Sequence, residues 1–186
     1  MRIESLELEQ FRNYRLQTVD FDPRCNVIFG ANAQGKTNLL EAIVYLSCGR
    51  SPRARSDQEM IGFDAGAARL TATVLARERE FRVQAELFRD RRRKLSVNKS
   101  AALSEVYHTV YFRPEDLFLI REGAAARRKF LDTALCQLRP RYAAALTEYN
   151  RLYEHKTRIL RDSEERPDLL AALPDFNEQM VRFGAV

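Results

Sequence analysis

The sequence predicts an α/β fold followed by a helical segment, and three observations support this prediction. Residues 30–37 read Gly-Ala-Asn-Ala-Gln-Gly-Lys-Thr, which matches the phosphate-binding loop pattern G-x-x-x-x-G-K-[ST] between an apolar run and a helical pattern. Apolar and polar residues alternate in several segments of the first half, as in strands. After Pro114 the apolar spacing changes to that of helices. We therefore expect two lobes, residues 1–113 with the loop and residues 114–186 as an incomplete helical lobe.

The first lobe should contain most of the strands. A strand-like opening leads through a turn at residues 12–14 into a second strand, and an apolar run predicts a buried strand directly before the loop. A helix should follow the loop and bury Leu39, Ile43 and Leu46, which fall at helical spacing. The predicted strands are residues 3–8, 16–21, 26–29, 70–75, 80–88, 94–97 and 110–112, and the predicted helix is residues 36–47.

The second lobe should contain three helices. Residues 124–138 have helical spacing, Pro140 can begin a second helix at its first position, and residues 175–183 start a third. Along the second helix, steps of four and three residues predict an apolar seam, as in a helical hairpin. The seam residues are Tyr142, Leu146, Tyr149 and Tyr153.

The loop pattern has a physical reason at each defined position. Gly30 and Gly35 permit backbone conformations and close approaches that a side chain would forbid. Successive backbone N–H groups and the positive end of the following helix attract phosphate. Lys36 suits the β- and γ-phosphate oxygens, and the Thr37 hydroxyl suits magnesium. The alternative is an ordinary glycine turn before a helix.

The predicted ligand is therefore a nucleoside triphosphate with Mg²⁺. Its expected binding residues are Gly30, Ala31, Asn32, Ala33, Gln34, Gly35, Lys36 and Thr37, with Thr37 also at the metal.

Basic residues gather in one segment. The chain has a net charge of +5, and residues 77–99 account for all of it. The densest cluster consists of Arg89, Arg91, Arg92, Arg93 and Lys94. Such a cluster can bind a DNA phosphate backbone without reading sequence, or it can be the solvated tip of a hairpin. Charge alone does not separate these two interpretations.

Composition limits the class of protein. With 186 residues and 45% hydrophobic residues the chain can form a globular core, and no apolar run approaches the ~20 residues of a membrane span. The N-terminus lacks a signal-peptide pattern, so we expect a cytoplasmic protein without a membrane partner. Cys25, Cys48 and Cys136 are odd in number and far apart, which favours reduced thiols.

Three further patterns are incomplete. Residues 98–101 begin like the guanine-reading N-K-x-D, but Ala101 replaces the acid, so we interpret them as a hairpin turn and expect adenine. Residues 109–116 resemble a Walker B strand interrupted by Arg113 and Pro114, which leaves Glu115 or Asp116 as a candidate contact to the metal or its water. His108 and His155 lack partners at ligand spacing.

Two spaced motifs carry a family resemblance. The opening strand into residues 11–14 (Phe-Arg-Asn-Tyr), followed by the loop and residues 38–43, resembles the head of the SMC-like ABC ATPases. Residues 114–120, with residues 127–132 reading Arg-Arg-Lys-Phe-Leu-Asp, resemble the RecF family within them. The turn between these last segments departs from the family pattern, because Glu122 stands where Gly is usual and Ala124 where Pro is usual.

The resemblance implies an ABC/SMC-type ATPase head, with a mixed sheet plus an antiparallel β subdomain, followed by an α-helical lobe. It implies ATP in the loop, with Arg12 near the phosphates and Asn32 lining them. A surface role for Arg12 and a simple turn role for Asn32 are the alternatives. Members dimerise head to head around ATP and bind double-stranded DNA and single-strand/double-strand junctions. With RecO and RecR they help RecA to load, within the SOS and repair response.

Two motifs that hydrolysis requires are missing from the sequence after Lys36. These are a Walker B strand ending Asp-Glu and a Ser-Gly-rich signature loop, which in the family lie nearer the C-terminus. We therefore expect the N-terminal part of a longer, slow DNA-dependent ATPase that alone binds nucleotide weakly. Another SMC-like or anti-phage P-loop ATPase, or a non-enzymatic DNA-interaction module, is the alternative.

Overall fold

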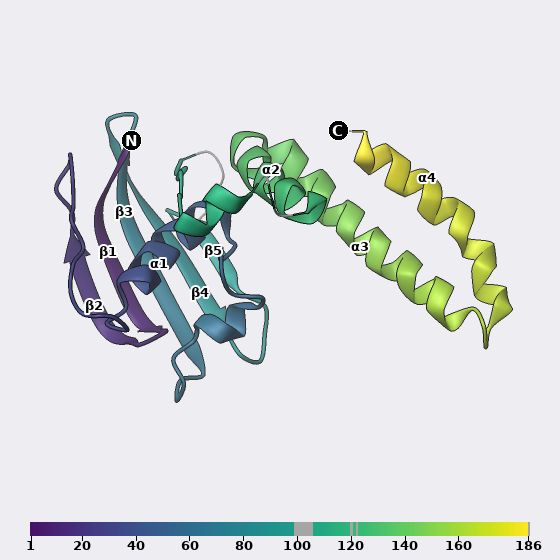
Figure 1. Ribbon diagram of the computed structural model, residues 1–186, viewed down its shortest axis with the longest axis horizontal. Helices are drawn as coiled ribbons and strands as arrows, with labels where there is room; N and C mark the ends of the chain where they lie inside the picture. The colour runs from purple at the N-terminus through teal and green to yellow at the C-terminus, as the bar shows by residue number, and fades with distance from the viewer. Residues whose placement is uncertain (99–105, 120, 122, 186) are drawn as a thin grey trace. The chain divides into compact units, whose positions relative to one another are not determined.

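The computed structural model describes residues 1–98, 106–119, 121 and 123–185 (Figure 1). The chain divides into two compact units, residues 1–121 and residues 122–186. The assignment of residues 1–113 and 114–186 to two lobes stays a prediction, since a compact unit need not coincide with a lobe of a larger fold.

A five-stranded sheet dominates the first unit. Its strands are β1 (Arg2–Phe11), β2 (Tyr14–Asp20), β3 (Ala67–Ala76), β4 (Arg79–Phe88) and β5 (Lys94–Val97), in the order β2-β1-β3-β4-β5. All neighbouring strands are antiparallel. They correspond to five of the predicted strands and form an antiparallel β subdomain.

Helix α1 (Lys36–Cys48) lies across one face of this sheet (Figure 1). Buried residues alternate with polar ones along much of β1, β3 and β4, so their side chains share that face. The core includes Leu6, Leu8, Leu70, Ala72, Val74, Val83, Ala85 and Leu87 from the sheet and Leu39, Ala42, Tyr45 and Leu46 from α1. Of the helix residues predicted to be buried, Leu39 and Leu46 are buried and Ile43 is partly buried.

A tight turn joins β1 to β2 beside the start of α1. Arg12 adopts a left-handed conformation with φ 54°, and Phe11 pairs with Tyr14 across the turn. The turn is held by the short helix η1 (Asp57–Met60), because the Arg12 N–H donates to the Met60 carbonyl over 2.8 Å. Arg12, Asn13 and Tyr14 are thereby presented to the phosphate loop.

Two predicted strands are wrong. Residues 26–29 and 110–112 are not in strands, and Phe29 and Val110 are 89% and 101% exposed. An apolar run indicates burial, but a strand also needs a neighbour to satisfy its backbone hydrogen bonds. None of the described strands pairs with either segment. The predicted hairpin turn at residues 98–101 lies outside the described residues except for Asn98.

The second unit is helical, as predicted. It contains α2 (Ala124–Leu138), α3 (Pro140–Asp162), the short helix η3 (Pro167–Ala172) and α4 (Leu173–Gly184), and α3 and α4 form an antiparallel hairpin (Figure 1). Across this hairpin the rings of His155 and Phe176 stack, with centroids 6.1 Å apart. No helix among the described residues is long and apolar enough to cross a membrane.

The seam of α3 differs in two residues from the prediction. Ala145 and Leu152 are buried where Leu146 and Tyr153 were expected; Leu146 is partly buried and Tyr153 is 56% exposed. Ala145 and Leu152 are seven residues apart, about two helical turns, so they lie on one stripe together with Tyr142 and Tyr149. At the start of α3, the Tyr142 hydroxyl donates to Asp132 of α2 over 2.6 Å. Asp132, the last residue of the Arg-Arg-Lys-Phe-Leu-Asp segment, therefore ties two helices together.

Candidate functional site

The glycine loop runs directly into the N-terminus of α1. Gly30 and Gly35 have φ values of 144° and 103°, in the region that favours glycine. Lys36 begins the helix, and its Nζ lies back across the loop, donating to the carbonyls of Gly30 and Ala31 over 2.9 and 2.7 Å. The first N–H groups of α1 have no acceptor within the helix, and the Lys36 ammonium lies at the same loop. Donors and positive charge at one loop are a suitable arrangement for phosphate.

Gly35 is required for a second reason besides its dihedral angle. A Cβ at this position would lie 2.8 Å from Asn13 Oδ1 and 2.9 Å from the Tyr14 hydroxyl oxygen. The Asn13 amide donates to the Gln34 carbonyl and the Tyr14 hydroxyl donates to the Gly35 carbonyl, each over 3.2 Å. The β1–β2 turn therefore contacts the loop at a glycine, and a side chain there would displace the ends of Asn13 and Tyr14.

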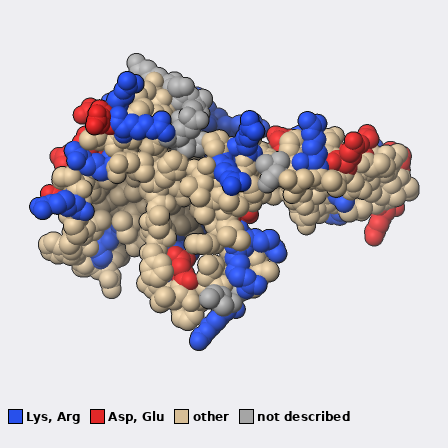
Figure 2. Space-filling model, turned by 90° about the horizontal axis from the view of Figure 1, so that it is seen from above, with Lys and Arg blue, Asp and Glu red and all other residues tan. Residues whose placement is uncertain are grey.

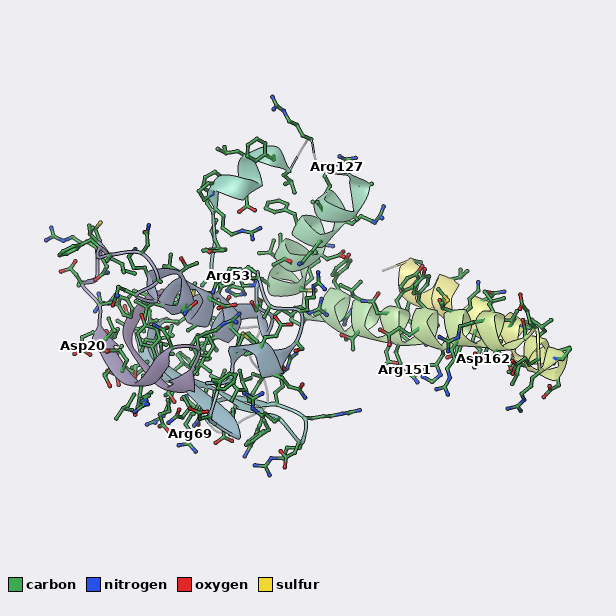
Figure 3. All side chains as sticks on the ribbon, turned by 60° about the horizontal axis from the view of Figure 1, so that its bottom comes forward. Asp20, Arg53, Arg69, Arg127, Arg151 and Asp162 are labelled. Atoms are coloured by element: carbon green, nitrogen blue, oxygen red, sulfur yellow. The ribbon has the colours of Figure 1, made fainter. Side chains whose placement is uncertain are left out.

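A buried carboxylate lies on the next turn of α1. Glu41 is fully buried and accepts a two-pronged interaction from Arg12, over 2.9 and 3.0 Å. Arg53, which is labelled in Figure 3, donates through Nη2 to the same carboxylate over 2.6 Å, and the Ser51 hydroxyl also donates to it. Burial raises the pKa of Glu41, but the hydrogen bonds from Arg12, Ser51 and Arg53 outweigh it, so the net pKa is lowered.

Sequence patterns gave no role to Glu41, Ser51 or Arg53. Asn13 and Tyr14 were noted only as part of the family motif of residues 11–14. The available signal was an acid between apolar residues of the predicted helix, which calls for a cationic partner if it is buried. Arg12 is brought beside the loop helix, where its third contact is the Glu59 carbonyl over 2.7 Å. Its contact with phosphate stays a prediction, as does the lining role of Asn32, which is exposed.

The residues suit a magnesium-bound triphosphate better than a metal held by protein alone. Thr37 lies exposed in the first turn of α1. Within the described part of the chain, no group of three or more His, Cys, Asp or Glu could hold a metal ion. A metal at Thr37 would therefore need phosphate oxygens and water for its remaining ligands.

The Walker B-like segment has a local structural role. Asp116 caps the short helix η2 (Pro114–Phe118), accepting from the Arg113 N–H over 2.8 Å and pairing with the Arg113 side chain over 2.8 Å. The Arg113 hydrogen bond also lowers the pKa of Asp116. The side chain of Glu115 lies outside the described part. A metal contact by either residue has no support here.

The basic cluster at the β4–β5 turn separates into residues with different partners. Arg89 donates to the carbonyls of Ala65 and Gly62, over 2.8 and 3.1 Å, and so tethers the loop before β3. Arg93 pairs with Asp57 over 3.0 Å and donates to the Tyr45 hydroxyl over 3.2 Å. These two arginines are thereby engaged in structural contacts.

Arg91, Arg92 and Lys94 are exposed. Arg91 stacks on the Phe88 ring at 3.7 Å from its centroid. An open hollow of about 540 Å³ lies beside the turn, lined by Ser56, Asp57, Gln58, Phe88, Arg91, Arg92 and Arg93. On the face drawn in Figure 2, Lys and Arg side chains lie in several separate groups. DNA binding by the cluster stays a prediction.

Comparison with known proteins places these features in context. The profile of a family described as an AAA domain matches residues 5–173. The chain is 36% identical over 189 residues to the DNA replication and repair protein RecF of Agathobacter rectalis, covering 99% of the chain and 52% of that protein. It is 37% identical over 188 residues to RecF of Streptococcus pneumoniae (strain P1031), covering 99% of the chain and 51% of that protein. The chain thus spans about half the length of the curated relatives it matches.

Solved structures give the same picture. A structure of the recombination mediator protein RecF with ATPrS, in the RecFOR pathway, superposes with a TM-score of 0.88 at 31% identity. A RecF–ATP structure gives a TM-score of 0.85 at 32% identity. They cover 99% and 98% of this chain, and 51% of each of those chains is matched. An Smc head from Pyrococcus furiosus, at 18% identity and a TM-score of 0.56 over 98% of this chain and 55% of that one, shares the fold.

Proposed function

The chain belongs to the AAA domain family and matches RecF proteins over nearly its whole length, and from this we propose that it is the ATP-binding part of a RecF-type DNA replication and repair protein. The observation that supports the proposal most directly is the loop of residues 30–37, with Gly35 in a glycine-only conformation and Lys36 across the loop.

In the proposed binding mode each part of the loop has one task. The backbone N–H groups and the positive end of α1 hold the phosphates, and the Lys36 ammonium neutralises the β- and γ-phosphate oxygens. The Thr37 hydroxyl is the protein's ligand to magnesium. Bound ATP supplies the triphosphate charge and the free energy of its hydrolysis. Arg12, fixed by Glu41 beside the loop helix, adds positive charge near the phosphates.

The functions of the whole protein belong to the same proposal. We propose that ATP promotes a homodimer, that the dimer binds double-stranded DNA and single-strand/double-strand junctions, and that hydrolysis is slow and DNA-dependent. RecO and RecR are the proposed partners in helping RecA to load. The RecFOR pathway named for the solved RecF structures supports this assignment. The cytoplasmic location and the SOS response stay predictions from the sequence.

Replacement of the loop lysine tests the proposal. Lys36→Ala removes the only loop side chain that neutralises phosphate, so MgATP binding measured by isothermal titration calorimetry should weaken at least about 100-fold, as loss of a close charge contact implies. DNA binding measured with and without ATP should lose its dependence on ATP.

The matched control is Lys129→Ala, which removes an exposed lysine of α2 and should leave both measurements unchanged. If Lys36→Ala bound DNA as the unaltered chain does, with the same response to ATP, the protein would instead be a DNA-interaction module with a structural loop.

A further inference from the structure

Two side chains outside the phosphate loop fix two consecutive peptide groups within it. Asn13 holds the Gln34 carbonyl and Tyr14 holds the Gly35 carbonyl. In a trans peptide the C=O and the following N–H point in opposite directions, and no described peptide bond is cis. The N–H groups of Gly35 and Lys36 therefore point away from the β1–β2 turn. These N–H groups belong to the end of the loop where α1 begins.

The direction of the Asn13 hydrogen bond is set by a chain of donors. Arg53 Nη2 donates to Asn38 Oδ1 over 2.6 Å, and Asn38 Nδ2 donates to Asn13 Oδ1 over 2.8 Å. A guanidinium can only donate and a backbone carbonyl can only accept, so each amide between them has one allowed orientation. Asn13 must then present its NH₂ group to Gln34. We call Arg53, Asn38 and Asn13 the amide relay.

Steric fit adds to this fixation. Asn13 and Tyr14 approach the position of a Cβ at residue 35 to within 2.8–2.9 Å, so a side chain there would displace the ends of both. The same residue has φ 103°, which other residues rarely adopt. Loop backbone and turn side chains therefore fit each other in a single arrangement.

We propose that Asn13 and Tyr14 are positioning residues for nucleotide, which aim the N–H groups of Gly35 and Lys36 at the triphosphate. The inference rests on the proposed function, because it concerns the same loop. It assigns to the turn a task separate from that of Arg12: the turn does not touch the ligand but sets the direction of two donors that do. Without the Asn13 contact the Gln34–Gly35 peptide group can rotate, and the binding free energy must then include the cost of ordering it. The Gly35–Lys36 peptide group has a second restraint, because the Leu39 N–H also donates to the Gly35 carbonyl, over 3.0 Å, so Tyr14 adds to the fixation by α1.

The test compares two variants of the 186-residue chain with a matched control. Tyr14→Phe keeps the ring and removes only the hydroxyl, and Asn13→Ala removes the end of the relay. Loss of one hydrogen bond of ordinary strength should weaken MgATP binding about fivefold in Asn13→Ala, and by a smaller factor in Tyr14→Phe, where the Leu39 N–H still holds the Gly35 carbonyl. The control Tyr142→Phe also removes a tyrosine hydrogen bond, to Asp132, and should lower thermal stability without changing MgATP affinity.

A spectroscopic measurement separates positioning from a general loss of structure. In the unaltered chain, MgATP should move the amide proton resonances of Gly35 and Lys36 downfield, as hydrogen bonding to phosphate does. This change should be smaller for Gly35 in Asn13→Ala and smaller for Lys36 in Tyr14→Phe, and in both variants it should be unchanged for amides of β3 and β4.

The results test the positioning role separately from the proposed function. If the unaltered chain binds MgATP and both variants bind it equally well, the positioning role is wrong and the proposed function stands. Weaker binding with the full change in the Gly35 and Lys36 resonances would also overturn the positioning role. Absence of MgATP binding by the unaltered chain would overturn the proposed function and this inference with it.

Discussion

At the scale of single residues, Glu41 is the most constrained side chain of the site. A fully buried carboxylate is costly unless its oxygens are paired, and here they accept from Arg12, Arg53 and Ser51. The two guanidiniums are themselves partly exposed, with side-chain exposures of 22% and 35%. Their removal would therefore cost less than that of the carboxylate.

Glu41→Gln tests this constraint. The amide keeps the shape but loses the charge, so two arginines remain beside a neutral group. We expect the free energy of unfolding, measured by urea denaturation near pH 7, to fall by about 2–3 kcal/mol, below the range for fully buried pairs because the arginines are partly exposed. Glu148→Gln removes a carboxylate from the exposed pair with Arg151 (Figure 3) and should cost under about 1 kcal/mol.

The stability difference between the unaltered chain and Glu41→Gln should depend on pH in a defined way. The pKa of Glu41 is lowered in the folded chain, so its contribution is complete above the unfolded value of about 4.3 and is lost as pH falls through the folded value. The stability difference between the unaltered chain and Glu41→Gln should thus be constant from pH 7 to pH 5 and shrink in more acidic solution. A difference that grew on acidification would contradict the assignment.

The conformation of the loop was predictable because one short segment defines it, and the roles of its residues stay predictions. The loop pattern alone predicted Gly35, Lys36 and Thr37, because their spacing fixes the geometry locally. The partners of Glu41 were not predictable in this way. Arg12 and Arg53 are 29 and 12 residues away in sequence, and only the packing of the turn and loop against α1 brings them to one carboxylate.

At the scale of elements, the β4–β5 turn divides its positive charge between structure and solvent. Arg89 is held by carbonyls and Arg93 by Asp57, whereas Arg92 is exposed. If the turn binds the DNA backbone, Arg92 is well placed to do so without disturbing the fold. Arg93, in contrast, links the turn to Tyr45 of α1.

Arg92→Glu therefore tests DNA binding at this turn better than a change at Arg89 or Arg93, which make structural contacts. Loss of one phosphate contact should reduce the slope of log affinity against log salt concentration by about 0.9. Arg79→Glu makes the same charge change at the exposed start of β4 and is the control. Equal slopes for the two variants in a DNA-binding titration over a range of salt concentrations would exclude a direct role for Arg92.

Elements were predictable from sequence where their partners are close in the chain. The alternating pattern predicted β3 and β4 correctly, because a tight turn brings the two strands together and they pair along their whole length. The helices of the second unit were predicted correctly because the hydrogen bonds of a helix are local. The strand predictions for residues 26–29 and 110–112 were wrong because an apolar composition does not show whether another strand is available for pairing.

At the scale of the whole molecule, burial is unevenly distributed between the two units. The contiguous core lies in the first unit, between the sheet and α1. Among the described residues of the second unit, only Ala145 and Leu152 are buried hydrophobic side chains. Stability should follow the same distribution, since opening a region costs more where more apolar surface is buried.

Hydrogen exchange measures this difference directly. Amides of β1, β3 and β4 should exchange slowest, and amides of α2, α3 and α4 should exchange faster although all are in regular structure. The experiment is a time course of deuterium uptake resolved to peptides. Equal protection of the two units would mean that the helical unit is stabilised by contacts beyond those described.

The amide relay has one more consequence, which concerns protons. Asn13 and Asn38 do not titrate, an arginine stays protonated in proteins, and burial raises the pKa of Tyr14 above its ordinary value of 10.0. Neither the two amides nor the Tyr14 hydroxyl therefore changes its charge near neutral pH, and the Glu41 carboxylate beside Arg53 stays ionised there because its pKa is lowered. The orientation of the Gly35 and Lys36 peptides should thus be insensitive to pH changes around neutrality.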